Sequence, residues 1–459
     1  MTKKSISRLL QASLMCCLAV LFTACDDIFA SEDNPIPAYL SMSDKPVTIK
    51  VGDTYRRKAI SVTTAVVEYT SSKTDVATVD NEGLVTAKAE GITTITATAT
   101  GYSSQNGKKI YQPASVSYVV TVTPATVSAT SLTLNKTTEV LAKNGDALTI
   151  TATATPAEAT LTWESSDEAV ATVADGVVTP VGLGIATITA KSGDLKATCE
   201  VFVGTEVDDV SARNPIQDYD ILAGTNNSSA ITIPAGCHVA FNGVNTDKGV
   251  KCNGEATIYL IDGSTNTITA QDDYAGIEVG AAGLTINAET AGTGILNVTG
   301  GLKGAGIGTS EAYNSSQTCG DITINGGTIT ATGGNGAAGI GTGLSFGSGA
   351  PTNQTCGDIT INGGIVTATG GLYGAGIGTG YSFNNGAVTS NECGAITIGT
   401  GVTSVTAIMG NGSPISIGMG ASSGYSGNYG IQTCGTITIG GDATTYAAGV
   451  TTSPFTYEP

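Results

Sequence analysis

Hydrophobic and polar residues alternate with a period of two along the C-terminal half of the chain. Ile322 and Ile324 share one face of a segment whose other face carries Asp321 and Thr323. The segment 328–332 alternates Thr with Ile and Ala in the same way. This period is typical of β-strands with one buried face, and no helical period runs through the region. The pattern therefore predicts short strands that are separated by Gly-Gly corners.

These strands recur as a repeat. The sequence Cys-Gly-x-Ile-Thr-Ile occurs four times, at spacings of 37, 37 and 41 residues (356−319, 393−356, 434−393), and begins at Cys319, Cys356, Cys393 and Cys434. A fixed period of this size indicates a solenoid. Three strands per repeat would form one rung of a parallel, right-handed β-helix, with rungs about 4.8 Å apart. Looser copies begin near residue 221, which gives about seven rungs. We expect residues 444–459 to cover the open last rung.

Two earlier segments, 39–123 and 127–204, show short alternating strands at regular spacing with turn residues between them. This arrangement predicts two tandem β-sandwiches, so the expected fold is all-β throughout. The second copy carries Trp163-Glu-Ser-Ser-Asp-Glu-Ala-Val-Ala-Thr-Val173, and the first has Tyr69 where the second has Trp163. Both segments closely resemble the bacterial Ig-like group 2 domain. The resemblance implies a stalk or adhesive module without catalytic residues, in which Trp163 belongs to the core.

The first 24 residues have a basic start, an apolar run too short to span a membrane, and small residues before Cys25. This is the pattern of an export signal. Leu-Phe-Thr-Ala-Cys25 resembles a lipobox, so we expect Cys25 to carry a lipid, the alternative being an ordinary secretory signal. Residues 25–38 form an acidic tether, and residues 205–220 are predicted to be a second linker. The expected location is the outer membrane, lipid-anchored and exposed at the cell surface.

The chain is strongly acidic. Its formal net charge of −18 becomes −21 once cleavage removes Lys3, Lys4 and Arg8. This charge excludes nucleic acid and anionic lipid surfaces as partners. It allows neutral glycans, or anionic glycans held through a bridging cation. The 62 glycines and the low aromatic content also favour a repetitive β architecture over an ordinary enzyme core.

Longer segments precede each copy of the repeat cysteine from residue 310 onward. Each carries an aromatic residue beside Asn, Gln and Ser, and the four aromatic residues are Tyr313, Phe346, Phe383 and Tyr425. Solenoids often bind through loops on one edge, and an aromatic column suits sugar faces. These four residues are the predicted ligand-binding candidates. The alternative is a ladder that packs the loops onto the coil.

Acidic residues lie close to these loops. Asp321 and Asp358 occupy one repeat position, and Glu311 and Glu392 lie in the loops themselves. Carboxylates in a row can hold Ca²⁺, which prefers oxygen ligands. The sequence therefore predicts a possible calcium site, with solvated acids as the alternative. No cofactor is required by this interpretation.

The repeat cysteines predict a ladder of side chains one rung apart, open to three interpretations: buried free thiols, disulfides, or a metal site. Gly374-Ala-Gly-Ile-Gly-Thr-Gly380 looks like a dinucleotide loop, but no helix follows it and the motif recurs, so it is structural. The motifs Ile-Thr-Ile-Asn-Gly-Gly and Ala-Gly-Ile-Gly, over residues 257–441, resemble bacterial surface β-helix proteins. That resemblance implies binding of acidic plant polysaccharides with calcium.

The combined hypothesis is a surface lipoprotein, expected to be monomeric, that displays a non-catalytic glycan-binding β-helix on an Ig-like stalk. The first alternative is a polysaccharide lyase or hydrolase on the same scaffold. A lyase needs a basic residue, and after residue 204 the chain has four Lys or Arg and one histidine, His238. A hydrolase needs a carboxylate pair, for which Asp321 and Asp358 are the candidates. A protein-binding adhesin is a further alternative. The outward threonines also allow an ice-binding array.

Overall fold

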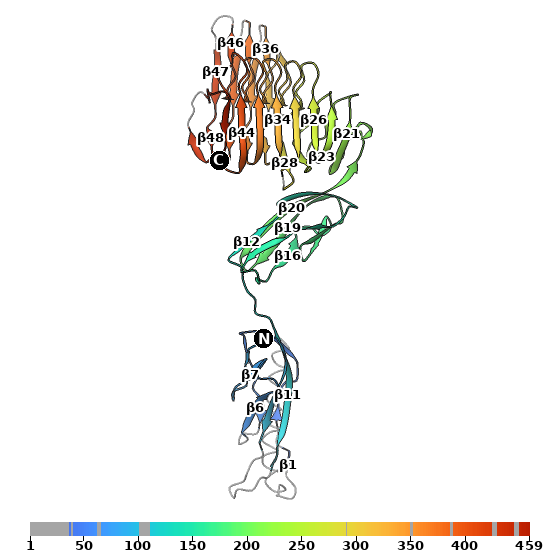
Figure 1. Cartoon of the computed structure of the whole chain (residues 1–459), viewed down its shortest axis with the longest axis vertical. Helices are drawn as coiled ribbons and strands as arrows, with labels where there is room; N and C mark the ends of the chain where they lie inside the picture. The colour runs from blue at the N-terminus through green and yellow to red at the C-terminus, as the bar shows by residue number, and fades with distance from the viewer. Residues whose placement is uncertain are drawn as a thin grey trace, which may run out of the picture. The chain divides into compact units, whose positions relative to one another are not determined.

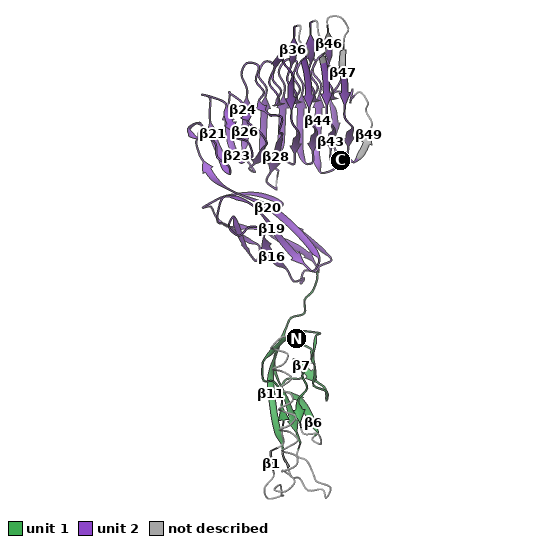
Figure 2. Cartoon of the chain, turned by 180° about the vertical axis from the view of Figure 1, so that it is seen from behind, with its two compact units in different colours: residues 1–128 green, residues 129–459 purple. Residues whose placement is uncertain are grey.

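The computed structural model describes residues 36–37, 40–61, 66–100, 111–290, 292–348, 352–385, 389–424, 429–444 and 449–459. The predicted export signal and Cys25 lie outside these residues. The chain divides into two compact units, residues 1–128 and residues 129–459 (Figure 2). Within the described residues there is no α-helix, and none of the structure there is long and apolar enough to cross a bilayer as a helix.

The first unit is a β-sandwich. One sheet has the order β3-β11-β9-β6 and the other β4-β8-β7. The strands are β3 (Val47–Lys50), β4 (Thr54–Arg56), β6 (Val67–Ser71), β7 (Ala77–Val79), β8 (Leu84–Ala87), β9 (Gly91–Ala99) and β11 (Ala114–Thr123). Four short strands form two separate pairs: β1 (Ile36–Pro37) with β10 (Tyr111–Gln112), and β2 (Leu40–Ser41) with β5 (Ile60–Ser61). Tyr69 is buried in the core, and its hydroxyl accepts a hydrogen bond from the backbone N–H of Ala59 at 2.7 Å. A tyrosine is tolerated there because its polar atom has a partner.

The second unit begins with a similar sandwich. Its strands are β12 (Ser131–Leu134), β13 (Thr138–Ala142), β14 (Leu148–Thr149), β15 (Ala152–Thr155), β16 (Thr162–Ser165), β17 (Ala171–Ala174), β18 (Val177–Pro180), β19 (Gly184–Ser192) and β20 (Leu195–Val207). Trp163 packs against a core that includes Ile150, Val178 and Ile188, as its interpretation as a core residue requires.

The sandwich and the solenoid share one continuous sheet, and the predicted linker, residues 205–220, runs from the end of β20 to the start of the next strand. The end of β20 pairs in parallel with β21 (Asp220–Thr225), and Thr205 is the register partner of Asp220. Between them a short 3₁₀ turn, η1 (Val210–Ala212), buries Val210. Arg213 binds the buried carboxylate of Asp220 through two hydrogen bonds of 2.7 Å. These residues are therefore ordered by strand pairing and a buried ion pair.

The solenoid is a parallel β-helix, as predicted (Figure 1). One face is a seven-stranded sheet of β22 (Ile231–Ile233), β24 (Val250–Cys252), β27 (Ile277–Glu278), β30 (Ile307–Gly308), β35 (Ile340–Gly341), β40 (Ile377–Gly378) and β45 (Ile417–Gly418). This agrees with the expected number of rungs. The first rung's long strand β23 (Cys237–Thr246) pairs with both β25 (Ala256–Leu260) and β26 (Thr265–Thr269) of the next rung.

The other two faces carry the alternating strands seen in the sequence. One column is β25 (Ala256–Leu260), β28 (Leu284–Ala288), β33 (Ile322–Ile324), β38 (Ile359–Ile361), β43 (Ile396–Ile398) and β48 (Ile437–Ile439). The other is β26 (Thr265–Thr269), β29 (Ile295–Thr299), β34 (Thr328–Thr332), β39 (Gly364–Thr369) and β44 (Val402–Ile408). Ile322 pairs with Ile359 and both side chains are fully buried, so identical residues stack into one apolar core.

The C-terminal residues cover the last rung, as expected. β49 (Asp442–Thr444) pairs antiparallel with β48, and β50 (Phe455–Tyr457) pairs antiparallel with β44. Val450 is buried and forms an isolated antiparallel bridge with Ile417. These antiparallel strands satisfy the backbone hydrogen-bonding groups at the edge of the sheet, and their reversed direction prevents a further parallel rung from being added.

Candidate functional site

The longer segments of the later rungs form strands of their own, where the sequence predicted loops. They build two parallel four-stranded sheets that we call the insert lobe (Figure 1). One sheet is β31 (Ala312–Tyr313), β36 (Ser345–Gly347), β41 (Ser382–Asn384) and β46 (Ser422–Gly424). The other is β32 (Gln317–Cys319), β37 (Thr352–Cys356), β42 (Thr389–Cys393) and β47 (Tyr429–Cys434). The lobe is therefore a regular extension of the coil and holds its side chains in fixed register.

Three of the four predicted aromatic residues form a stacked column on the lobe. The ring centroids of Tyr313 and Phe346 lie 5.6 Å apart, and those of Phe346 and Phe383 lie 5.2 Å apart, with interplanar angles of 13° and 20°. The next register position after Phe383 is Ser423 and not Tyr425. Tyr425 itself lies outside the described residues.

Two further tyrosines extend the column, and sequence reasoning did not select them. Tyr381 lies 6.3 Å from Phe383, and Tyr373 lies 5.0 Å from Tyr381, measured between ring centroids. The Tyr381 hydroxyl bonds the Ser423 hydroxyl. The five rings make one continuous surface, which we call the aromatic face. Tyr381 directly follows a Gly-Ile-Gly-Thr-Gly run, at the repeat position that Leu344 occupies one repeat earlier. This shared position could have indicated that Tyr381 lies beside the column.

Stacking limits what the aromatic face offers to a ligand. A sugar ring packs on the flat side of an aromatic ring, but the flat sides of Phe346 are covered by Tyr313 and Phe383. Tyr313 belongs to the first strand of its sheet and is 59% exposed, so its outer flat side is open. Phe346 and Phe383, which are only half-buried, present ring edges. Tyr313 is therefore the column residue best placed for stacking.

The interior of the insert lobe is polar. In two rungs a glutamine amide bridges the sheet to the coil: Thr309 donates to Gln317 at 2.6 Å, and Thr342 donates to Gln354 at 3.1 Å. The Gln354 amide also donates to the carbonyls of Gly343 and Tyr381. In the next rung Asn391 occupies the glutamine position. It is one methylene shorter and fully buried, and neither polar atom of its amide has a partner among the described residues.

Replacing Asn391 with glutamine is expected to stabilise the protein by about 1 kcal/mol, because the longer amide can reach Thr379 and Gly380, the repeat equivalents of the residues that bind Gln354 one rung earlier. The matched control is Asn353→Gln, the same change on the exposed face of β37, which we expect to alter stability by less than about 0.5 kcal/mol. Chemical denaturation followed by circular dichroism measures both. Equal effects in the two variants would contradict the argument.

The predicted acidic residues are partly committed to the fold. Asp321 accepts a hydrogen bond from the backbone N–H of Asp358 at 2.8 Å, and Asp358 accepts one from Ala395 at 2.7 Å. Glu311 pairs with Lys303 at 2.8 Å, and Glu392 is exposed on β42. No group of three or more His, Cys, Asp or Glu side chains suited to a metal ion occurs within the described ranges. Calcium binding by these four acids stays a prediction.

The repeat cysteines form a ladder of free thiols. Cys319, Cys356, Cys393 and Cys434 are register partners from rung to rung, and none forms a disulfide. Hydrogen bonding from Cys319 and burial hold the pKa of the Cys356 thiol well above its usual range. Such thiols stay protonated and unreactive at neutral pH, which suits a packing role.

The residues considered for catalysis lie in different parts of the β-helix, except that Asp321 and Asp358 are neighbours in adjacent rungs. The ring of His238 stacks on Tyr219 at 5.7 Å, and its Nδ1 lies 3.3 Å from Asp218, in an early rung. Lys303 is paired with Glu311 and lies 3.6 Å from Asp273. Asp321 and Asp358 each accept a backbone N–H, as described above. Each of these side chains is therefore bound to a neighbouring group in the fold.

Comparison with known proteins identifies both kinds of domain. Residues 39–110 match the family model described as Bacterial Ig-like domain (group 2), and residues 322–344 and 359–381 match the model described as Beta helix repeat. The chain therefore carries a bacterial Ig-like domain and a β-helix repeat, a combination that indicates a surface or adhesive protein. Neither family model describes an enzyme. No curated protein matches the chain.

The chain is similar to several solved structures over part of its length. It is similar to mouse Cadherin-23 EC22-24 at 17% identity, over 38% of this chain and 65% of that one, with a TM-score of 0.19. It is similar to domains 4 and 5 of the S-layer protein SbsC at 17% identity, over 37% and 98%, with a TM-score of 0.16. It is similar to Drosophila OTK extracellular domains 3-5 at 14% identity, over 36% of this chain and 60% of that one, with a TM-score of 0.20. The match spans less than two thirds of the cadherin fragment, and scores this low say nothing about ligands.

Proposed function

We propose that this protein is a surface-anchored lipoprotein that uses its β-helix to bind a glycan without cleaving it. In this proposal Cys25 carries the lipid and the Ig-like domains hold the β-helix away from the outer membrane. The domain combination supports a surface role. The acidic net charge of −18 fits a neutral glycan, or an anionic one bridged by a cation.

The observation that carries the proposal is the aromatic face. Five rings lie in continuous contact: four on or directly beside β31, β36 and β41 of the insert lobe, and Tyr373 in the corner between β39 and β40. Regular strand pairing therefore holds most of the rings in place before a ligand arrives. The tyrosines add hydroxyl groups to the apolar rings, and exposed Asn314 lies next to Tyr313. Aromatic surface beside hydrogen-bonding groups is the chemistry that recognises sugars.

The proposal is tested by binding of the full chain to a panel of neutral and uronic-acid polysaccharides, with calcium and with chelator. We expect Tyr313→Ala to weaken binding at least tenfold, because this ring offers its open side to the ligand, and to lower stability only by the lost stacking on Phe346, about 1 kcal/mol. Tyr274→Ala is the matched control, since Tyr274 is equally exposed and makes no ring contact within the described residues. Equal loss in both variants, or none in either, would contradict the assignment.

The same panel separates the alternatives. If chelator abolishes uronate binding and Asp321→Asn abolishes it as well, a cation bridges the polysaccharide to Asp321. The cation would bind the carboxylate oxygen that does not accept the N–H of Asp358. Binding to no polymer would favour a protein-binding adhesin, for which the stacked ring edges are also suited, because tyrosine and phenylalanine are enriched in protein interfaces. Shortened polysaccharide in the mixture would show that the protein is an enzyme.

A further inference from the structure

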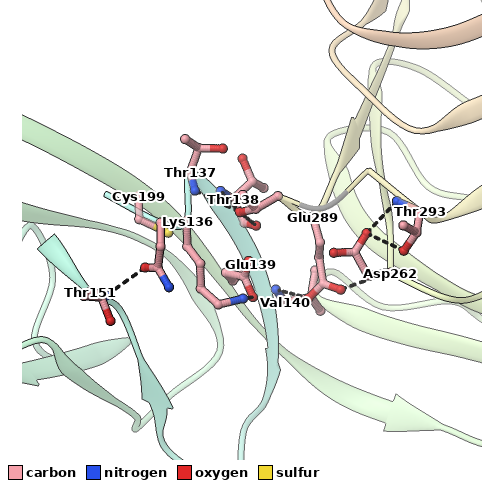
Figure 3. A network of polar contacts seen from close by, with 12 residues as sticks. Lys136, Thr137, Thr138, Glu139, Val140, Thr151, Cys199, Asp262, Glu289 and Thr293 are labelled. Carbon is pink, nitrogen blue, oxygen red and sulfur yellow. Dashed lines mark hydrogen bonds and ion pairs between the residues drawn. The ribbon is translucent and has the colours of Figure 1, made fainter. Parts of the chain in front are cut away.

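A second candidate site lies at the opposite edge of the β-helix, within the second unit. There the start of β13 and several corners of the coil enclose a groove of about 470 Å³. Thr137 and Thr138 of the Ig-like domain form one wall, and Glu289 and Thr293 belong to the neighbouring corner (Figure 3). None of the five rings of the aromatic face lines this groove.

The groove exists because one corner of the coil is longer than the next ones. Residues 289–294 join β28 to β29, whereas residues 325–327 join β33 to β34 and residues 362–363 join β38 to β39. The long corner projects and binds the Ig-like domain: the Thr290 hydroxyl accepts hydrogen bonds from the N–H groups of Thr137 and Thr138. The shorter corners behind it then form a recessed floor.

The floor is flat because glycine is required there by the stacking of rungs. A methyl group on Gly363 or Gly401 would overlap a backbone carbonyl of the preceding rung. The backbone N–H groups of Gly326 and Gly401 donate to no protein acceptor in the part of the chain that the structure describes. Thr328 and Thr403 add side-chain hydroxyls. Gly326, Gly363 and Gly401 belong to corners of three successive rungs, about 4.8 Å apart, whereas the rung of Ile365 separates the two threonines.

The lining carries almost no charge. Glu289 is its one ionisable residue, and both carboxylate oxygens already accept backbone hydrogen bonds, from Val140 at 2.8 Å and from Asp262 at 2.7 Å. Hydroxyls and free N–H groups without aromatic rings or charges suit a neutral, hydroxyl-rich ligand. Donors that repeat along the coil axis suit a linear polymer more than a single small molecule.

We propose that this groove binds a segment of a neutral linear polysaccharide, at a site separate from the aromatic face. The proposal shares with the proposed function only the class of ligand. Two sites on opposite edges of one β-helix would let a single molecule hold two polymer chains, or one chain at two points, and so raise retention on a polysaccharide surface by multivalency.

The test is affinity electrophoresis of the full chain through gels that contain neutral linear glucans, xylans or mannans. The blocking variant is Thr328→Tyr: this position has Ile295 and Ile365 as register partners, so the column accepts a large side chain. Thr330→Tyr is the control, two residues further along the same face of β34 and outside the groove. We expect Thr328→Tyr to weaken retention on at least one neutral polymer about tenfold and Thr330→Tyr to leave it unchanged.

Several outcomes would overturn this proposal, and they are distinct from failure of the aromatic site. Retention lost in Tyr313→Ala but kept in Thr328→Tyr would leave the proposed function intact and remove the groove. Retention lost in Thr328→Tyr but kept in Tyr313→Ala would establish the groove and remove the aromatic face. Wild-type protein that passes every neutral gel without retardation would exclude the groove as a neutral-glycan site.

Discussion

Replacing Gly341 with alanine is expected to unfold the β-helix, with a loss of at least about 4 kcal/mol. Gly341 has a φ of 133° and lies in a column with Gly308 and Gly378, which are its register partners in the adjacent rungs. A methyl group at Gly341 would overlap the carbonyl oxygen of Gly378. That oxygen belongs to the backbone and cannot move without separating two rungs, so the strain is not relieved by a side-chain rotation.

The matched control is Gly236→Ala. Gly236 also has a positive φ, 77°, but no atom lies within 4 Å of the position that its added methyl would take. We expect this variant to lose only about 1 kcal/mol, the conformational cost of alanine at such a φ. Guanidinium denaturation followed by far-UV circular dichroism compares the two. If both variants lose the same small amount, rung stacking does not require glycine at position 341.

This glycine column also shows why the coil was predictable from the sequence. Each rung repeats the same residues, so the pattern around Ile322 determines which side chains stack, and the cysteine spacing determines the rung. The column of Tyr313, Phe346 and Phe383 followed from the same repetition. The segment before Cys434 is longer, so Ser423 takes the position opposite Phe383, and the fourth candidate, Tyr425, lies outside the described residues and stays a prediction.

The features that the sequence did not reveal depend on contacts between segments that are far apart in the chain or in different rungs. The inserts are polar and rich in Gly and Asn, which is typical of loops, yet each pairs with the same segment in the next rung and becomes a strand. Asp321 was judged by its charge, whereas its carboxylate accepts the next rung's N–H. Residues 205–220 contain turn residues, but they are bracketed by strands that pair with each other. Glu289 contacts Val140, which is 149 positions away in the chain.

The second large effect is expected at that contact: Glu289→Ala should uncouple the Ig-like domain from the β-helix. One carboxylate oxygen accepts the N–H of Val140 and the other accepts the N–H of Asp262, so the side chain ties β13 to two corners of the coil (Figure 3). Removing it leaves two backbone donors without partners, at a cost of about 2–4 kcal/mol in total. Glu289→Gln is expected to lose part of this stability. Its amide oxygen can still accept one of the two N–H groups, but its NH₂ group faces the other N–H, which is also a donor.

The chain's single tryptophan makes this measurable. Trp163 lies in the Ig-like domain of the second unit, so its fluorescence follows that domain, while far-UV circular dichroism is dominated by the β-helix. We expect both probes to report one transition in the wild-type protein and two separated transitions in Glu289→Ala. Glu255→Ala is a control, since Glu255 lies in an early rung and its side chain forms no hydrogen bond within the described residues. Coincident transitions in Glu289→Ala would show that the remaining contacts, which include β20–β21 pairing and the Thr290 hydrogen bonds, are enough to couple the domains.

The dependence of this coupling on pH provides a second signature. Burial raises the pKa of Glu289 above its ordinary value of 4.5, with the nearby charges of Glu139 and Asp262 contributing in the same direction, although the two N–H donors oppose the shift. A carboxyl group whose pKa is raised on folding stabilises the native state fully below its unfolded pKa and loses that contribution as pH rises through the native value. The Trp163 transition of the wild-type protein should therefore lose stability as pH rises from below 4.5 toward neutrality, relative to Glu289→Ala. A difference between the two proteins that is constant over this range would mean that Glu289 titrates as it does in the unfolded chain, and that its contribution at the joint comes from its hydrogen bonds alone.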